Sequence, residues 1–322
     1  MYLAADIGGT KTLLALGDGG GVRMQRRYDN DAHENPAALI GCFLQEARAT
    51  GLGAQVAASC LALAGPVGVG TTRARLTNRA WTIDAKRLAQ ALPIGPVTLV
   101  NDFAASAAGI DTLAADEFVT LQQGQPDRNA LQLAIGPGTG LGVAACLPHP
   151  REGQRVLASE GGHVGFAPAN GEQQGLLEFL RVRHGPTSHV SVERVVSGSG
   201  LRDCYDYCAG AGPEEIGALA PAEVSARALA ASDPHCVRAL DLFLAVFGAH
   251  AGDMALCFLA RGGVYLLGGI VPKLLPRLAS GPFLAAFNAK AEHAPLMAAM
   301  PVFAVLAEDM ALRGALECAI RA

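Results

Sequence analysis

The sequence predicts an α/β protein with two domains, and three observations lead to this prediction. Short apolar stretches typical of buried strands alternate along the chain with longer stretches of helical patterning. The order strand, glycine–threonine turn, strand occurs at the N-terminus and again near the middle of the chain, which indicates an internal repeat. The length of 322 residues also favours two domains, at roughly 150 residues for each.

The first half is expected to open with a hairpin. A strand over 2–7 ends at the first glycine turn (residues 8–10), and a second strand covers 12–16. A helix over 36–50 follows, with Asn35 as its N-cap. The remaining elements expected in this half are strands over 55–64 and 97–100 and a helix over 102–108.

The second half repeats this pattern around the second glycine turn (residues 136–140). Strands over 131–135 and 141–146 flank the turn. The other expected elements are helices over 175–183, 191–208, 221–230, 234–260 and 309–321 and strands over 264–267 and 302–306. Because no linker or low-complexity run separates the halves, we expect two domains that pack around a cleft. The small domain is expected to comprise 1–108 plus 305–322 and the large domain 109–304.

Composition argues against several kinds of partner. Lys plus Arg number 25 and Asp plus Glu 29, a net charge of −4 without a basic stripe, so we expect no nucleic-acid partner. The N-terminus lacks a signal-peptide pattern, and no apolar run reaches ~18 residues without interruption, so we expect no membrane span. The 8 cysteines are scattered without a C-x-x-C pair, which favours reduced thiols in a cytoplasmic protein.

Two glycine turns have the features that phosphate binding requires, because glycine has no Cβ to keep a phosphate away from the backbone. The first turn joins Gly8, Gly9 and Thr10 to Asp6 and Lys11, and the second contains Gly138, Thr139 and Gly140. Neither turn matches a P-loop or a dinucleotide fingerprint, since no G-K-[ST] and no helix follows. One such turn is more often a plain hairpin, but two of them, each with a threonine between strands, point to a bound nucleotide.

A third glycine pair and a group of polar residues complete the candidate site. Gly268 and Gly269 follow another strand and would let a nucleotide lie against the backbone, although such a pair is most often a simple turn. Sugar hydroxyls both donate and accept hydrogen bonds, so a sugar site mixes carboxylates, amides and histidine. The residues of these types at strand ends and in glycine-rich segments are Asn101, Asp102, Glu160, His163 and Glu193. Each also has an ordinary alternative, as a turn or cap, a locally satisfied histidine or an exposed helix charge.

Taken together, these segments resemble the bacterial glucokinase family. The matching stretches are DIGGTKT (6–12), LALAGPV (61–67), LTNRAW (76–81), VNDFAASAAGI (100–110), IGPGTGLGVA (135–144), SEGGHVGFAP (159–168), SVERVVSGSGL (191–201) and LLGGIVPK (266–273). The resemblance spans nearly the whole chain. It implies the two-domain actin-like ATPase fold, which is ribonuclease H-like with a central cleft. It also implies a kinase that phosphorylates glucose at the 6-hydroxyl with ATP and Mg²⁺, giving glucose 6-phosphate and ADP.

The resemblance further implies a role for each candidate residue. Asp102 is similar to the catalytic base beside the 6-hydroxyl, and Asp6 to the acid that orients Mg²⁺ through water. The implied sugar ligands are Asn101, Glu160, His163 and Glu193. The implied ATP-binding residues are Gly8, Gly9, Thr10, Lys11, Gly138, Thr139 and Gly140 at the phosphates and Gly268 and Gly269 at the adenosine. The family also implies a cytoplasmic enzyme of glycolysis that is often a homodimer.

Some features depart from the family pattern, and other functions stay open. Pro137 stands where a small residue is frequent, and its missing N–H changes the rigidity of the second turn. Ser199 stands where proline is common, with little expected effect. The related ROK sugar kinases usually carry a cysteine-rich zinc loop, which does not follow His163 here. The open alternatives are a kinase for another hexose, a sugar-binding regulator without catalysis, and an actin-like or chaperone-like ATPase.

Overall fold

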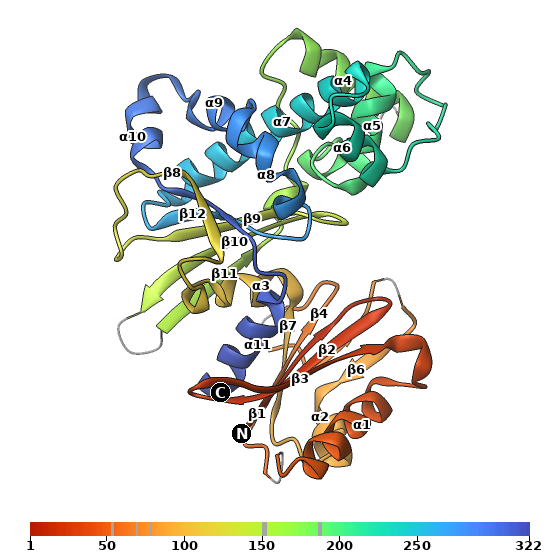
Figure 1. Ribbon diagram of the computed structural model, residues 1–322, viewed down its shortest axis with the longest axis vertical. Helices are drawn as coiled ribbons and strands as arrows, with labels where there is room; N and C mark the ends of the chain where they lie inside the picture. The colour runs from red at the N-terminus through yellow and green to blue at the C-terminus, as the bar shows by residue number, and fades with distance from the viewer. Residues whose placement is uncertain (53–54, 69, 78, 150–152, 186–188) are drawn as a thin grey trace. The chain divides into compact units, whose positions relative to one another are not determined.

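A computed structural model describes residues 1–322 except 53–54, 69, 78, 150–152 and 186–188 (Figure 1). Contacts within the chain divide it into two compact units. Unit 1 comprises Met1–Leu113, His149–Val156 and Asp309–Ala322, and unit 2 comprises Ala114–Pro148 and Leu157–Glu308. The domain boundaries expected at 108/109 and 304/305 stay a prediction.

Unit 1 is built on a five-stranded mixed sheet with the order β3-β2-β1-β4-β7. Its strands are β1 (Tyr2–Ile7), β2 (Lys11–Asp18), β3 (Gly21–Asp29), β4 (Ser59–Leu63) and β7 (Val97–Asn101). The first three strands are antiparallel neighbours, whereas β1, β4 and β7 run parallel. The helices are α1 (Pro36–Ala49), α2 (Ala85–Ala91), α3 (Asp102–Ala108) and α11 (Met310–Arg321), and a small hairpin joins β5 (Arg73–Arg75) to β6 (Thr82–Asp84).

Helices cover both faces of this sheet, and the residues of β1 show why. Alternate side chains of a strand point to opposite faces. Leu3, Ala5 and Ile7 belong to the core cluster that includes Phe43 of α1. Ala4 belongs to a second cluster of small residues and leucines on the α11 side. The inner strands β1 and β4 are therefore buried on both faces, between α1 and α2 on one side and α3 and α11 on the other (Figure 1).

A six-stranded sheet, most of whose strands belong to unit 2, repeats this strand order as β11-β10-β9-β12-β13-β8. The strands are β8 (Phe118–Gln122), β9 (Gln132–Pro137), β10 (Leu141–His149), β11 (Gly153–Ser159), β12 (Gly263–Leu266) and β13 (Val302–Val305). The hairpin β9–β10 is antiparallel, as β1–β2 is, and two parallel strands follow on its other side in both sheets. The repeat predicted from the two glycine turns is thus a repeat of sheet topology.

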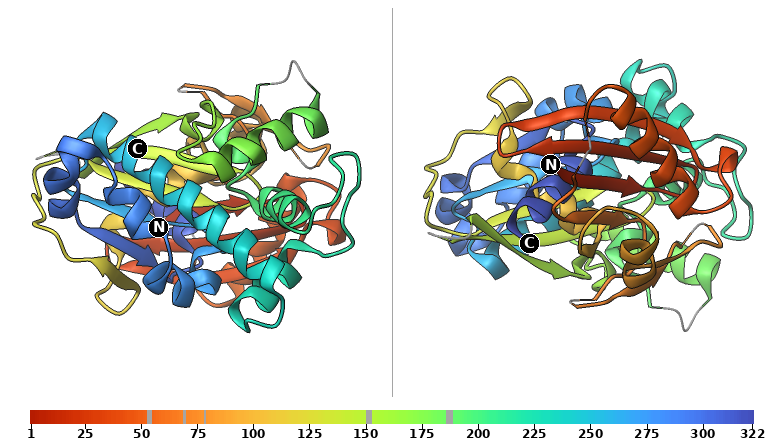
Figure 2. Two further views of the ribbon diagram at one scale, coloured as in Figure 1. Left: turned by 90° about the horizontal axis from the view of Figure 1, so that it is seen from above. Right: turned by 90° about the horizontal axis from the view of Figure 1, so that it is seen from below.

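Helices pack on the unit 2 sheet, and the longest of them lies in the core. The helices are α4 (Gly171–His184), α5 (Gly198–Cys208), α6 (Pro221–Leu229), α7 (Pro234–Phe258), α8 (Val271–Ser280), α9 (Phe283–Asn288) and α10 (Ala294–Ala299). Helix α7 runs along one face of the sheet (Figure 2) and contributes Phe243 and Phe247 to the main core cluster. By length and composition α7 could cross a membrane, but buried core helices pass the same test, and 61% of its apolar window is buried.

Several sequence-based predictions are confirmed closely. The strand expected over 2–7 is β1, and the helix expected over 102–108 is α3. The N-cap prediction is also confirmed, because Asn35 has extended backbone angles and its Oδ1 accepts a hydrogen bond from the Ala38 N–H at 2.9 Å. At these positions the neighbouring residues in the chain were enough to predict the secondary structure.

Other predictions are wrong at the ends of helices and strands, where side-chain contacts determine the backbone conformation. No single helix covers 191–208: a short 3₁₀ turn (Val192–Arg194) is followed by α5, which begins at Gly198. Ser197 is extended and caps α5, with its Oγ accepting from the Gly200 N–H at 3.1 Å. The strand expected over 55–64 is shorter, since β4 covers only Ser59–Leu63. Strand β3 was not expected, because this sheet-edge strand is mostly exposed and lacks apolar alternation.

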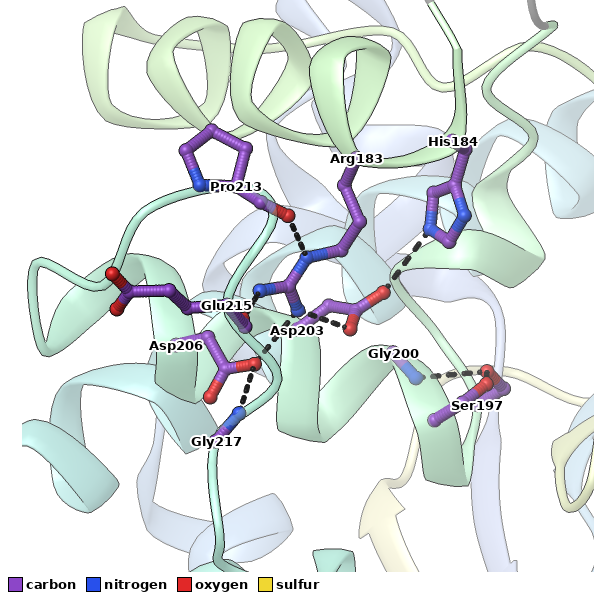
Figure 3. Close-up of polar contacts among 10 residues, drawn as sticks. Arg183, His184, Ser197, Gly200, Asp203, Asp206, Pro213, Glu215 and Gly217 are labelled. Carbon is purple, nitrogen blue, oxygen red and sulfur yellow. Dashed lines mark hydrogen bonds and ion pairs between the residues drawn. The ribbon is translucent and has the colours of Figure 1, made fainter.

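A buried ion cluster holds α4, α5 and the segment 209–220 of unit 2 together (Figure 3). The Arg183 Nη1 donates to Asp203 and to Asp206 at 2.7 Å each, and its other nitrogens donate to the Pro213 and Glu215 carbonyls. The exposed fractions of the Arg183, Asp203 and Asp206 side chains are only 8%, 7% and 1%. One buried cation thus compensates two buried carboxylates.

This cluster predicts a strong asymmetry between two arginines of the same helix. Arg183→Met should lower the free energy of unfolding by about 3–5 kcal/mol, because it removes the guanidinium that pairs with both buried carboxylates and leaves Asp203 with His184 alone as its ion-pair partner in the described part of the chain. Arg181→Met should change it by less than about 0.5 kcal/mol, since the Arg181 side chain is 46% exposed and pairs with Glu178 at the surface. Urea denaturation of both variants tests this. Equal effects of the two substitutions would contradict the analysis, and Asp206→Asn added to Arg183→Met should recover part of the loss.

Candidate functional site

The parallel strands of unit 1 end together, and this common edge carries the first part of the site. Ile7 of β1 pairs with Leu63 of β4, and Leu63 pairs with Asn101 of β7. The residues that follow each strand therefore leave the sheet at the same edge. Ligands of open parallel sheets bind at such carboxyl ends. The edge brings together the first glycine turn, Gly65 and Asp102.

Asn101 orients Asp102 at this edge. The Asn101 side chain is the N-cap of α3, with Oδ1 accepting from the N–H groups of Phe103 and Ala104 at 3.0 and 3.1 Å. Its Nδ2 donates to the Gly65 carbonyl at 3.0 Å and to the Asp102 Oδ1 at 3.1 Å. The Phe103 N–H donates to the same Asp102 oxygen at 2.8 Å. These bonds hold the Asp102 carboxyl in one rotamer at the start of a helix.

Burial raises the pKa of both acids of this edge, Asp102 and Asp6. Burial raises the pKa of Asp102, although hydrogen bonds from the Phe103 N–H, its own N–H and the Asn101 side chain oppose the rise. Burial, and then the nearby charge of Asp102, raise the pKa of Asp6 to about 6, and Arg27 opposes this only in part. The edge is therefore a place where negative charge is costly unless a cation arrives.

The first glycine turn lies directly after β1. The Gly8 N–H donates to the Lys11 carbonyl at 3.0 Å and closes the turn, while Thr10 and Lys11 are exposed. Sequence reasoning missed the residues that hold this turn from the side: the buried Asn30 and, outside it, Arg79. Neither residue lies next to the turn in the chain, and the available sequence signals were the residue type of Asn30 and the position of Arg79 in the matched stretch 76–81.

The second glycine turn is held by the N-terminal end of α5. The Gly138 N–H donates to the Gly140 carbonyl at 2.7 Å, and the Gly198 N–H donates to the Gly138 carbonyl at 3.0 Å. Pro137 is the last residue of β9 and pairs with Leu141, so its missing N–H does not disturb the turn itself. Thr139 is exposed between the two glycines.

The predicted acidic and imidazole side chains of unit 2 lie together beside this turn. His163 Nδ1 is 3.9 Å from Glu193 Oε1, and His163 Nε2 is 3.8 Å from Glu160 Oε2. The other Glu193 oxygen, Oε2, accepts a hydrogen bond from the Leu141 N–H at 2.8 Å. Glu193 thus connects the carboxylate–imidazole group to the backbone of the second turn.

A side chain at either of two glycines near Glu193 would disturb the present contacts. A Cβ on Gly140 would collide with the Glu193 carboxylate, and a Cβ on Gly162 would collide with the Leu141 carbonyl. The glycine-rich sequence of these loops therefore reflects contact between them. The third pair lies close by, since Gly268 has a φ of +97° and faces the Pro137 carbonyl. A Cβ on Gly269 would meet open space.

The donors present fit a magnesium ion held mainly by other ligands. Among the residues that the structure describes, no three His, Cys, Asp or Glu side chains form a group that could hold a metal alone. Mg²⁺ is usually bound through one or two carboxylates together with water and substrate phosphates. The Asp6 carboxyl, with its raised pKa and its place beside the first turn, suits this partial role.

Two hollows lie elsewhere. The hollow in unit 1, about 410 Å³, is lined by residues that include Asn35, Arg73 and Arg87, and the one in unit 2, about 640 Å³, by residues that include Arg238 and Asp241. None of the predicted site residues lines either of them. The candidate site is therefore defined by strand ends and turns.

Known proteins are similar to this chain over nearly its whole length. The glucokinase family model matches residues 3–322. The glucokinase of Synechocystis sp. is 37% identical over 99% of this chain and 97% of its own length. The solved glucokinase from an Antarctic psychrotroph is 29% identical, with a TM-score of 0.86 over 100% of this chain and 99% of its own. A ROK family glucokinase from Streptomyces griseus, solved in complex with glucose and AMPPNP, shares the fold with a TM-score of 0.64. It is 21% identical, and the match covers 100% of this chain and 99% of its own.

The repeated sheet topology and the similarity to solved glucokinases identify a sugar kinase of the actin-like ATPase fold. The fold predicted from the resemblance is thereby confirmed. The chain belongs to the glucokinase family and is a transferase.

The raised pKa of Asp6 predicts a pH-dependent stability difference. Between the unfolded value, about 3.9, and about 6, the native state binds more protons than the unfolded state, so stability falls as pH rises through this window. Asp6→Asn removes the effect. Its melting temperature should exceed that of the wild type by about 2–4 °C at pH 8, and the gap should close towards pH 4.

Asp102→Asn provides the control for this experiment, because the charge of Asp102 contributes to the raised pKa of Asp6. In an Asp102→Asn background, the gain from Asp6→Asn at pH 8 should be smaller. A variant with Asp6→Asn that is less stable than the wild type at pH 8 would contradict the assignment.

Proposed function

We propose that this chain transfers the γ-phosphoryl group of ATP to the 6-hydroxyl of glucose, giving glucose 6-phosphate and ADP. The observation that carries the proposal is the Asp102 carboxyl, fixed by Asn101 at the carboxyl edge of the sheet beside Asp6 and the first glycine turn. Membership of the glucokinase family supports glucose as the acceptor. The relative solved with glucose and AMPPNP supports ATP as the donor.

Asp102 acts in this proposal as the general base. The 6-hydroxyl oxygen attacks the γ-phosphorus in line, and its proton passes to the Asp102 carboxylate late in the step, as the oxygen bonds to phosphorus. Burial raises the pKa of Asp102, which makes its carboxylate a stronger base than an exposed one. The hydrogen bonds to Oδ1 keep the group from turning away.

The glycine turns and Asp6 serve the ATP phosphates. The backbone N–H groups of Gly8, Gly9 and Thr10 and of Gly138, Thr139 and Gly140 would bind phosphate oxygens, with Lys11 adding charge. Mg²⁺, when bound, neutralises charge on the transferring phosphoryl group. The Asp6 carboxylate would hold it through water, and the cation in turn offsets the repulsion between Asp6 and Asp102. Gly268 and Gly269 would leave room for the adenosine.

The sugar is recognised in this proposal by groups of both hydrogen-bonding types. Glu160 and Glu193 accept from sugar hydroxyls, and His163 can donate or accept. Asn101 would add an amide, although its side chain already caps α3. Mannose and amino sugars differ from glucose at C2, so the fit around His163 would set the preference among hexoses.

The remaining expectations follow from the family. We expect a cytoplasmic enzyme of glycolysis that forms a homodimer and has neither nucleic-acid nor membrane partners. ADP production with glucose, compared with mannose, fructose and no sugar, tests the proposal directly. Turnover that does not depend on sugar would contradict it and favour a plain ATPase.

Asp102→Asn tests the proposed base. The amide oxygen can still accept from the Phe103 N–H, so the local structure should persist. We expect kcat to fall by about 10²–10⁴-fold while the Kd for glucose changes little. Steady-state kinetics and calorimetric glucose titration measure the two quantities. A variant that retains nearly wild-type kcat would rule Asp102 out as the base.

Two substitutions at Glu193 separate its two contacts. Glu193→Gln keeps an oxygen for the Leu141 N–H, so it should raise the glucose KM by about 10–100-fold with little change in the ATP KM. Glu193→Ala also removes the support of the second turn and should raise the ATP KM by about 3–10-fold. Equal ATP KM values in the two variants would show that the Leu141 contact does not matter for ATP.

A further inference from the structure

Asn30 is a buried polar residue that the mechanism above does not use. It directly follows β3 and begins a short 3₁₀ turn (Asn30–Ala32). Its side chain is 0% exposed, although an asparagine is rarely buried without hydrogen bonds that compensate for lost water. The partners of this side chain therefore indicate what it does.

The Asn30 amide group contacts the first glycine turn. Its Nδ2 donates to the Gly8 carbonyl at 2.9 Å and to the Gly9 carbonyl at 3.2 Å. Its Oδ1 accepts from the Thr12 hydroxyl at 2.7 Å, and Thr12 is also buried. The Asn30 N–H donates to the Thr10 carbonyl at 2.8 Å. Asn30 therefore binds three successive carbonyls of the turn.

Because the peptide group is planar, these contacts determine the direction in which the Gly9 and Thr10 N–H groups point. In a planar trans peptide the C=O and the N–H point to opposite sides. Holding the Gly8 and Gly9 carbonyls towards Asn30 turns the N–H groups of Gly9 and Thr10 the other way. In the described part of the chain, neither of these N–H groups donates to another backbone carbonyl. Successive N–H groups that point the same way bind anions.

Arg79 holds the same segment from outside. Its Nη2 donates to the Asn30 carbonyl at 2.9 Å, and its Nη1 donates to Asp31 at 2.7 Å and lies 3.4 Å from the Gly9 carbonyl. The guanidinium lies 4.2 Å from the centre of the Trp81 ring. These contacts fix the position of Asn30 relative to the turn.

We propose that Asn30 is a positioning residue of the phosphate site: it aims the N–H groups of Gly9 and Thr10 at the phosphates of ATP. The inference rests on the proposed function, because it assigns phosphates to this turn. Donors oriented before the reaction stabilise developing charge without reorganisation. Thr12 supports this role of Asn30. The Thr12 hydroxyl donates a hydrogen bond to the Asn30 Oδ1, which keeps the Asn30 Nδ2 directed at the turn.

Asn30→Asp is the principal test, because it keeps the shape but replaces the donor with an oxygen that repels both carbonyls. We expect kcat/KM for ATP to fall by about 10–100-fold, with the Kd for glucose within about twofold of the wild type. Thr12→Val, which leaves Asn30 in place but frees its amide, should cause a smaller loss in the same parameter. Thr12→Ser keeps the hydroxyl and should restore nearly wild-type values.

Nucleotide binding separates this inference from the proposed function. Binding of ATP and of a non-hydrolysable analogue is measured by calorimetry, and the amide resonances of Gly9 and Thr10 are followed by NMR. Nucleotide-induced shifts of these resonances in the wild type that weaken in Asn30→Asp support the inference even if glucose is not phosphorylated. A folded Asn30→Asp variant with wild-type nucleotide affinity and kcat overturns it. If Asn30→Asp does not fold, Thr12→Val decides by the same readouts.

Discussion

The burial of two carboxyl groups at one sheet edge is the constraint on which this site depends. Strands β1, β4 and β7 run parallel and end in register, so Asp6, near the end of β1, and Asp102, directly after β7, lie at the same edge of the sheet. Burial and the charge of Asp102 raise the pKa of Asp6 to about 6. Negative charge at such an edge is unfavourable by itself. In the function proposed above, a magnesium ion with bound phosphates would compensate for it.

The two units present backbone turns by the same topology but hold them by different side chains. In unit 1 the neutral amide of Asn30 binds the carbonyls of the first turn. In unit 2 the Glu193 carboxylate binds the Leu141 N–H, and the Gly198 N–H binds the Gly138 carbonyl. A Cβ would lie 3.1 Å from the Lys11 carbonyl at Gly8 and would collide with the Glu193 carboxylate at Gly140, whereas at Gly138 it would meet nothing within 4 Å. The repeat therefore preserves the sheet and the turn, while the supporting contacts are particular to each unit.

In unit 2, helix α5 contacts both the second glycine turn and the buried ion cluster around Arg183. Its N-terminal end binds the second glycine turn through Gly198, and its later residues Asp203 and Asp206 belong to the buried cluster around Arg183 (Figure 3). The cluster fixes the helix against α4 and the segment 209–220. Because a helix is stiff over this length, holding one end restricts the other. The position of the turn thus depends on contacts that take no part in chemistry.

The sequence by itself determined the strand and helix pattern, the glycine turns and the residue types of the site. These features depend on neighbours in the chain: apolar periodicity, the Asn35 cap and glycine's lack of a Cβ. Only the tertiary structure decided where α5 begins, that β3 forms, and that Asn30 and Arg79 support the first turn. Those outcomes depend on hydrogen bonds and burial between residues far apart in the chain, which local patterns do not encode.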